Sequence, residues 1–147
     1  MELKDMFSKE RIIFDMKSKT KNEALEELIG LLVKDNKVND PEVFKNAVLK
    51  REEEFSTGIG MGIAIPHGKS NSVKEASIVF GKSPEGIDYD SMDGKPAHLF
   101  FLIAVPEAEA SNVHLKALSE ISRKLMHSEV REGLMNCGSF EDFLKVF

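Results

Sequence analysis

A histidine between a proline and a glycine is the most unusual local arrangement in the chain, within the run GIGMGIAIPHGKS at residues 58–70. Pro66 fixes its own φ angle and restrains Ile65 to an extended conformation. Gly68 lets the backbone turn sharply and approach a ligand closely. We therefore expect His67 to lie at the end of a strand with a small neighbour, a setting that suits a reactive site better than a core.

A second histidine and an arginine could act on the same ligand. The sequence places His114 in the first turn of a helix, where free N–H groups and partial positive charge lower a histidine's pKa and attract phosphate. Arg51 falls near the end of another predicted helix and could clamp a phosphate through two parallel hydrogen bonds. The alternative for Arg51 is a solvated side chain in the charge run KREEE.

Two nucleotide-binding motifs fail by one residue in the glycine-rich segment. A phosphate-binding loop ending in Gly68-Lys69-Ser70 and a dinucleotide fingerprint starting at Gly58 would both require glycine at position 63, which is Ile63. No serine or cysteine stands in a nucleophile motif, and no close carboxylate pair indicates glycoside chemistry. The remaining possibility is that a histidine is itself the nucleophile.

Metal binding is not expected, and neither is a cofactor. His67, His98, His114 and Cys137 show none of the usual ligand spacings. His98 opens a predicted strand, His127 lies near the end of a helix, and Cys137 precedes a glycine at a predicted helix end. We interpret these three residues as structural or incidental.

Composition indicates one soluble globular domain over residues 1–147, with 41% hydrophobic and 31% charged residues. A net charge of −5 and the absence of tryptophan or a basic stripe argue against nucleic-acid binding. The longest apolar run, LFFLIAV, is too short for direct membrane insertion, and the first residues lack the order of a secretion signal. The single cysteine excludes an intrachain disulfide, so we expect a cytoplasmic protein.

The elements that must position these residues alternate between strands and helices. Apolar runs predict strands over 11–16, 76–82 and 98–106, and glycines at 58, 60 and 62 form a flexible approach to IAIPH. Helical patterns follow caps at Thr20, Asp40 and Ser139, and another covers 111–128. Turn signals stand at 84–86 and 93–94. This order predicts an α/β fold with helices covering a sheet.

The helical patterns also predict which side chains face the core. Those expected to face inward are Ala24, Leu25, Leu28, Ile29 and Leu32 in the first helix, Val43, Phe44, Ala47 and Val48 in the second, and Val113, Leu115, Leu118, Ile121, Ser122 and Leu125 in the helix over 111–128.

Two segments together resemble a known family. REEEFSTGIGMGIAIPHGK and NVHLKALSEISRKL are similar to the IIA domain of the fructose/mannitol class of the bacterial phosphoenolpyruvate-dependent sugar phosphotransferase system. The similarity covers almost the whole chain, and PEGIDYDSMDGKP looks more like the fructose branch. Nitrogen-regulatory relatives share the T-G-I-G and I-P-H-G motifs, so a regulatory protein that acts by phosphorylation-dependent binding is the alternative.

The resemblance implies a mixed β-sheet flanked by helices on both faces, and a role for each site residue. His67 matches the histidine that carries the phosphoryl group, while His114 and Arg51 match residues beside it. Phospho-HPr would be the donor and a cysteine of a IIB domain the acceptor, with a IIC membrane permease downstream. We expect phosphorylation at Nε2, because Nδ1 lies closer to the main chain and can donate to a backbone carbonyl.

Overall fold

A mixed six-stranded sheet forms the centre of the computed structural model, which describes residues 2–108 and 112–147. The strands are β1 (Ile12–Ile13), β2 (Gly58–Gly60), β3 (Ile63–Ala64), β4 (His67–Ser70), β5 (Ser77–Ile87) and β6 (Ala97–Pro106). The long antiparallel pair β5–β6 is central. β1 runs parallel to β5, β3 and β4 run parallel to β6, and β2 is antiparallel to β3.

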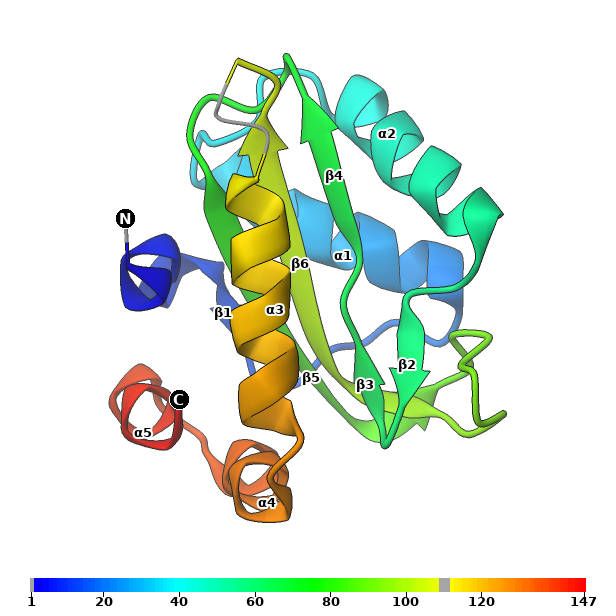
Figure 1. The fold of residues 1–147 in the computed structure, drawn as a ribbon, viewed down its shortest axis with the longest axis vertical. Coiled ribbons are helices and arrows are strands. Elements are labelled where there is room, and N and C mark those ends of the chain that lie inside the picture. The colour runs from blue at the N-terminus through cyan, green and yellow to red at the C-terminus, as the bar shows by residue number, and fades with distance from the viewer. Residues whose placement is uncertain (1, 109–111) are drawn as a thin grey trace.

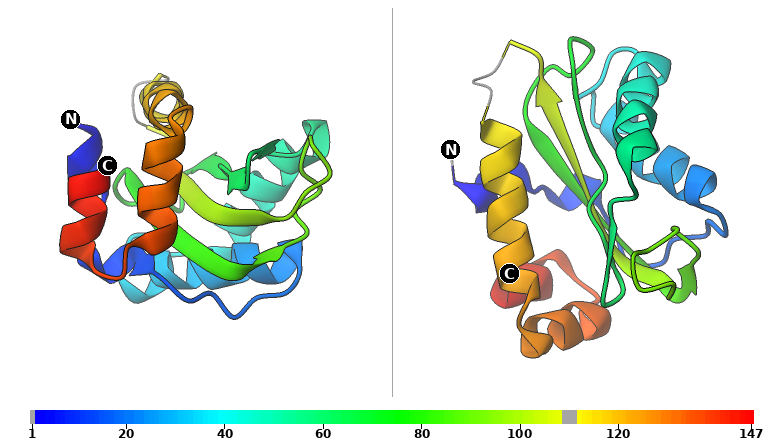
Figure 2. Two further views of the ribbon diagram at one scale, coloured as in Figure 1. Left: turned by 90° about the horizontal axis from the view of Figure 1, so that it is seen from below. Right: turned by 45° about the vertical axis from the view of Figure 1, so that its right-hand side comes forward.

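Helices cover both faces of this sheet (Figures 1 and 2), as the resemblance implied. One face carries α1 (Lys21–Lys34) and α2 (Pro41–Glu54). The other carries α3 (Val113–Leu125), α4 (Ser128–Asn136) and α5 (Phe140–Val146), together with the short 3₁₀ turn η1 (Leu3–Met6). A second 3₁₀ turn, η2 (Lys9–Arg11), contacts α1 and β5. The predicted α/β class is confirmed.

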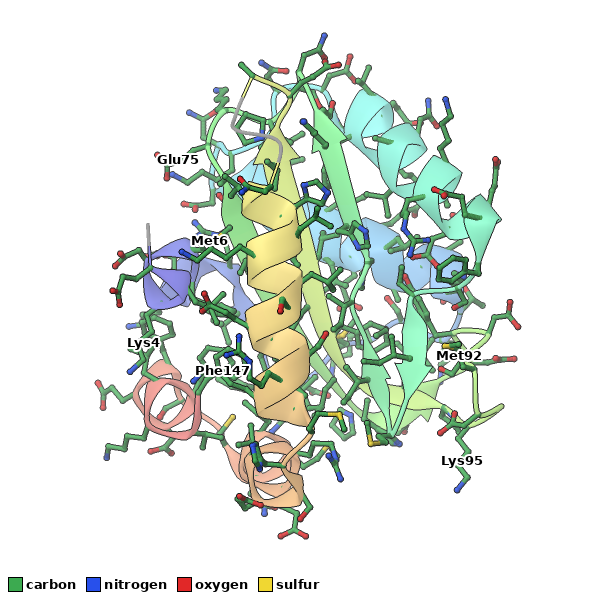
Figure 3. All side chains as sticks on the ribbon, in the orientation of Figure 1. Lys4, Met6, Glu75, Met92, Lys95 and Phe147 are labelled. Carbon is green, nitrogen blue, oxygen red and sulfur yellow. The ribbon has the colours of Figure 1, made fainter. Side chains whose placement is uncertain are left out.

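The central strands divide their apolar side chains between two cores. Ile78 and Phe80 of β5 pack with the α3–α5 layer, whereas Val79 between them packs with α1 and α2. This alternation is what a strand covered on both faces requires, since successive side chains point to opposite sides. Phe147 also belongs to the core between the sheet and the α3–α5 layer, and Figure 3 shows its ring beside α3.

Three predicted helix starts are confirmed by their caps. Thr20 and Glu23 form a reciprocal capping box at the start of α1. The Asp40 carboxylate accepts a hydrogen bond from the Val43 N–H at 3.2 Å, and the Ser139 hydroxyl caps α5 in the same way. Each cap satisfies a backbone donor that the helix itself cannot pair.

The strand predicted over 11–16 is mostly wrong, because only Ile12–Ile13 form β1. Arg11 belongs instead to a 3₁₀ turn, and its guanidinium is buried. It donates to the Met6 carbonyl at 2.8 Å and pairs with Asp35 at 2.6 Å. A buried guanidinium must find such partners, and they keep Arg11 out of the strand.

The turn predicted at 84–86 is also wrong, since β5 continues to Ile87. The pairing with β6 changes register between Lys82 and Ile87, and Gly86 has a φ of 89°. An irregularity of this kind lets a strand carry a proline and a left-handed glycine without ending. The turn predicted at 93–94 is present.

Two side chains predicted to face inward are exposed: Val43 at 42% and Leu115 at 56%. In α2 the fully buried apolar positions are Phe44 and Val48, which are four residues apart, so the buried stripe is narrower than predicted. The helix predicted over 111–128 ends at Leu125, and the sequence pattern did not predict the separate helix α4. Residue 111 lies outside the described residues.

The glycines before the site form a hairpin rather than a flexible approach. β2 and β3 are joined through Gly60, Met61 and Gly62, all with positive φ angles of 97°, 58° and 77°. Asp93 accepts a hydrogen bond from the Met61 N–H at 3.0 Å. Asp93 belongs to the connection between β5 and β6, which lies beside β2. Figure 3 shows the exposed Met92 side chain of this connection.

Pro66 divides one edge of the sheet into two short strands. β3 pairs with β6 at Leu99–Phe100 and β4 pairs with β6 from Ile103 onward, with the proline between them. Proline has no N–H to give to the ladder, so the pairing is interrupted there. The interruption places His67 at the first position of β4.

Gly68 does not make the sharp turn that was predicted, because it lies within β4. A Cβ atom at this position would approach the Val48 Cγ2 atom to 2.9 Å and the Phe44 Cε1 atom to 3.2 Å. The glycine therefore serves close packing between α2 and β4.

Candidate functional site

His67 is half-buried at the start of β4, and its ring is tied to the main chain. Its Nδ1 atom lies 3.0 Å from the Ile65 carbonyl oxygen, the kind of contact that the sequence analysis expected. Because a carbonyl only accepts hydrogen bonds, this contact fits a neutral ring with the proton on Nδ1. In that tautomer Nε2 has a free electron pair.

His114 is the second residue of α3, and the fold brings it to His67. The two ring centroids are 6.2 Å apart, and the ring planes are inclined by 27°. His114 Nδ1 is buried and finds no hydrogen-bond partner within residues 2–108 and 112–147. Two imidazoles from distant parts of the sequence thus face each other, as the sequence analysis expected.

The protein lowers the pKa of His67 below the ordinary value of 6.5, mainly through burial. The nearby positive charge of Arg51 acts in the same direction. The Ile65 carbonyl and the carboxylates of Glu52 and Glu54 oppose the shift without cancelling it. His67 is therefore neutral near pH 7, the state in which an imidazole is a nucleophile.

The pKa of His114 is lowered as well, again mainly through burial and then through the proximity of His67 and Lys69. Mutual repulsion between two charged imidazoles disfavours protonation of either ring. The pair is consequently neutral near pH 7 and lies beside cationic side chains.

Arg51 stands in the last turn of α2. Its Nη1 atom donates to the Phe55 carbonyl at 3.0 Å, and the guanidinium lies 4.6 Å from the centre of the Phe55 ring. It forms no ion pair with a carboxylate in the part of the chain that the structure describes. Its charge acts on His67, and N–H groups not used on Phe55 are free for an anion.

Glu52 was not singled out from the sequence, where it stands beside Arg51 in the charge run KREEE. Glu52 is buried in the last turn of α2 and accepts hydrogen bonds from Thr57 and Tyr89. Its helical position could have revealed it, because Phe44, Val48 and Glu52 follow one another at intervals of four residues on the buried stripe.

The other residues considered for metal binding lie apart from the histidine pair. His98 Nδ1 contacts the Ser83 carbonyl at 2.9 Å, His127 is exposed between α3 and α4, and Cys137 is buried with its thiol donating to Leu134 O. No group of three or more histidine, cysteine, aspartate or glutamate side chains able to hold a metal ion occurs among the described residues.

None of the helices that the structure describes is long and apolar enough to cross a membrane. A neutral imidazole presents a free nitrogen, a second neutral imidazole faces it, and cationic side chains lie near enough to shift the pKa values of both. Such an arrangement can attack an electrophilic centre and bind an anion.

Sequence comparisons give the same family as the resemblance. The family model described as "Phosphoenolpyruvate-dependent sugar phosphotransferase system, EIIA 2" matches residues 5–147. A fructose-specific EIIABC component of Bacillus subtilis is 43% identical over 99% of this chain, which spans 23% of that relative's length. A fructose-specific EIIA component of Haloferax volcanii is 47% identical over 82% of this chain and 77% of the relative.

Solved structures share the whole fold. The nitrogen regulatory protein IIA-Ntr of Neisseria meningitidis superposes with a TM-score of 0.88, at 32% identity over 97% of this chain and 96% of the other. The mannitol IIA enzyme of Escherichia coli, solved in complex with its phosphorylated IIB enzyme, gives a TM-score of 0.80 at 29% identity over 95% and 96% of the two chains. With its family model, close relatives and fold all in agreement, this chain belongs to the type 2 EIIA family of the phosphoenolpyruvate-dependent sugar phosphotransferase system.

Proposed function

We propose that this chain is a phosphocarrier of a fructose-type sugar uptake system, with His67 as the phosphorylated residue. Phospho-HPr is the donor and a cysteine of a IIB domain is the acceptor, with a IIC permease downstream. The observation that best supports this role of His67 is the contact between its Nδ1 atom and the Ile65 carbonyl, which leaves Nε2 as the nucleophile. Membership of the EIIA family and the fructose-specific relatives support the reaction and the sugar class, and the family supports a cytoplasmic location.

In the transfer step the protein does not have to activate either reactant, because the nucleophile is a neutral imidazole and the donor is a phosphohistidine. The Nε2 electron pair attacks phosphorus while the N–P bond of the donor phosphohistidine breaks, and the donor imidazole retains the bonding electrons. The charge stays on the equatorial phosphoryl oxygens throughout. Positioning in line and stabilisation of these oxygens are therefore the main contributions to catalysis.

His114 and Arg51 are the groups suited to hold those oxygens. With Nδ1 of His114 buried and without a described partner, the favoured neutral tautomer carries its proton on Nε2 and donates from there. Arg51 supplies a permanent positive charge and further N–H donors. In the second half of the cycle, the IIB cysteine thiolate attacks phosphorus and the His67 imidazole leaves as a neutral group.

A second function is favoured by one observation, the close superposition on a nitrogen regulatory protein. In that case phosphorylation of His67 would switch binding to target proteins instead of feeding a sugar. Transfer onward to a IIB cysteine separates the two functions, because only a transport component requires it. The mannitol relative solved with phosphorylated IIB supports the transport function as the first choice.

The decisive experiment replaces His67 with glutamine. We expect His67→Gln to abolish phosphoryl transfer from phospho-HPr while its thermal unfolding stays close to that of the unmodified protein. His127→Gln is the matched control, since His127 is exposed and follows α3 at the end opposite to His114. Phosphate acceptance by His67→Gln would disprove the assignment.

Nitrogen-15 NMR of the phosphorylated protein identifies the modified ring atom. We expect the phosphorus coupling at Nε2 of His67, because Nδ1 is occupied by Ile65. A coupling at Nδ1 would contradict the proposed geometry even if His67 were the correct residue.

A further inference from the structure

A buried carboxylate, that of Glu52, stands next to Arg51 in the last turn of α2. Glu52 is only 9% exposed. Its Oε1 atom accepts from the Thr57 N–H at 3.1 Å and pairs with Lys21 Nζ at 2.9 Å. Its Oε2 atom accepts from the Thr57 hydroxyl and from Tyr89 OH, the latter at 3.3 Å. Burying a charge is costly, and here both oxygens are fully used by donors.

The donors around Glu52 come from separate parts of the fold. Lys21 opens α1, Thr57 precedes β2, and Tyr89 lies in the connection between β5 and β6. Lys21 also lies 4.7 Å from the centre of the Tyr89 ring. Burial and the Glu52 charge raise the pKa of Tyr89, so its hydroxyl stays protonated and remains a donor. One carboxylate thus joins three segments by hydrogen bonds.

Two backbone contacts connect this cluster to His67. The Thr57 carbonyl accepts from the Ile65 N–H at 3.0 Å. The carbonyl of the same Ile65 accepts from His67 Nδ1 at 3.0 Å. The path therefore runs from Glu52 to Thr57, from Thr57 to Ile65, and from Ile65 to the ring. This path passes through the gap between β3 and β4, where neither Ile65 nor Pro66 belongs to a strand paired with β6.

We propose that Glu52 is a positioning residue that fixes Thr57, and through it the Ile65 carbonyl that holds the proton on His67 Nδ1. This proposal deepens the proposed function and rests on it for its effect on transfer rate. Glu52 is buried and bonded to Thr57, Tyr89 and Lys21, so it acts through these residues. Its contribution is to keep one tautomer and one ring direction, so that Nε2 is always the free nitrogen.

A purely structural role is the competing explanation, because removing one partner of a buried ion pair is strongly destabilising in itself. The two explanations differ in one observable. A structural role changes the free energy of unfolding and leaves the ring of the folded protein as it was. A positioning role changes the tautomer of His67 in protein that is still folded.

The test compares Glu52→Gln with Glu53→Gln, which removes the same charge from the neighbouring exposed position. An amide has one oxygen for four donor contacts and turns an NH₂ group toward them, so the cluster cannot be satisfied. In the unphosphorylated variant we expect nitrogen-15 shifts of His67 to show a mixture of tautomers. Transfer from phospho-HPr should be slower by about 10- to 100-fold, as for other misplaced reacting groups. Glu53→Gln should match the unmodified protein in both measurements.

Milder variants cover the case in which Glu52→Gln does not fold. Thr57→Val removes one donor at nearly constant shape, and Thr57→Ser restores the hydroxyl. We expect mixed tautomers and slower transfer in the first variant and recovery in the second. A single Nδ1–H tautomer in both Glu52→Gln and Thr57→Val, or in Thr57→Val alone if Glu52→Gln is unfolded, would overturn the proposal. The tautomer measurement needs no phosphate donor, so it stands even if the unmodified protein accepts no phosphoryl group and the proposed function fails.

Discussion

At the scale of single residues, the site depends on two histidines that the protein keeps uncharged. Burial lowers the pKa of both rings below 6.5, and the proximity of His67 lowers the pKa of His114 further. A charged imidazole cannot act as a nucleophile, so the lowered pKa values extend the active range toward acid. The positive charge near the two rings therefore comes from the side chains of Arg51 and Lys69, and not from the rings themselves.

The pH dependence of transfer and of stability follows from this shift. The rate of phosphoryl acceptance should stay level as the pH falls from 8 to about 6.5 and decline only below it. The unfolded chain binds more protons than the folded chain in the window below about 6.5, so the free energy of unfolding should decrease there as the pH falls. NMR titration of both rings and urea unfolding at several pH values measure these effects, and midpoints above 6.5 would contradict them.

Removing either auxiliary side chain should slow transfer without abolishing it. His114→Ala and Arg51→Ala each lose a donor to the phosphoryl oxygens, a loss that typically costs about 2.7–4 kcal/mol, or 100- to 1,000-fold in rate. Single-turnover transfer from phospho-HPr is the measurement. Arg123→Ala, an exposed change in α3, is the control. Unchanged rates for both site variants would make His114 and Arg51 structural residues.

Some of these residues could be predicted from the sequence and others could not, for a physical reason. Pro66 marks His67 because its backbone restriction is local and can be read from the neighbouring residues. Glu52 is hidden because its burial depends on Tyr89 and Lys21, which are distant in the sequence. A carboxylate in a charged run is usually solvated, and only the helical spacing from Val48 hints otherwise.

At the scale of elements, the packing of α2 against β4 sets the position of His67. Gly68 allows this contact, since a Cβ atom there would meet both a side chain and the backbone nitrogen of Val48 at 3.3 Å. A sharp turn was predicted at this glycine from the sequence. The reason for the glycine lies in a helix that precedes it by many residues, and local sequence does not report such contacts.

A pair of glycine variants tests this packing. Gly68→Ala should lower the free energy of unfolding by about 1–3 kcal/mol through overpacking against α2, and it should slow transfer by displacing His67. Gly30→Ala should instead stabilise the protein by about 0.5–1 kcal/mol, because Gly30 lies inside α1 with nothing within 4 Å of its added Cβ. Urea unfolding compares the two, and equal stabilities would argue against the packing role.

Helices with strong caps were predicted well, and the strands less well. The cap of α1 is formed by residues three apart, so its signal is local. The length of β5 is set by its pairing with β6, which continues past Pro84 and overrides a local turn signal. The short strands beside Pro66 likewise exist only because β6 pairs with them.

At the scale of the whole molecule, we expect the transfer step to need protein groups alone. The donor already carries an activated N–P bond, and Arg51 and the neutral histidines supply the contacts that phosphoryl oxygens require. Transfer from purified phospho-HPr should therefore proceed at the same rate in excess chelator. A control reaction with added Mg²⁺ completes the comparison, and a strict dependence on the metal would refute this mechanism.

The order of pairing in the sheet has a consequence for how the protein folds. β5 and β6 are neighbours along the chain, whereas Ile12 must find Phe80 and Ile63 must find Leu99. Closing a short loop costs less entropy than closing a long one, so we expect the β5–β6 hairpin to form early and the β3–β4 edge to dock onto it later. His67 then reaches its place only after β6 exists, and His114 follows β6 in the chain. During synthesis His67 emerges first, but the histidine pair is completed only when α3, the helix after β6, has packed. An incomplete chain therefore carries His67 without its facing imidazole.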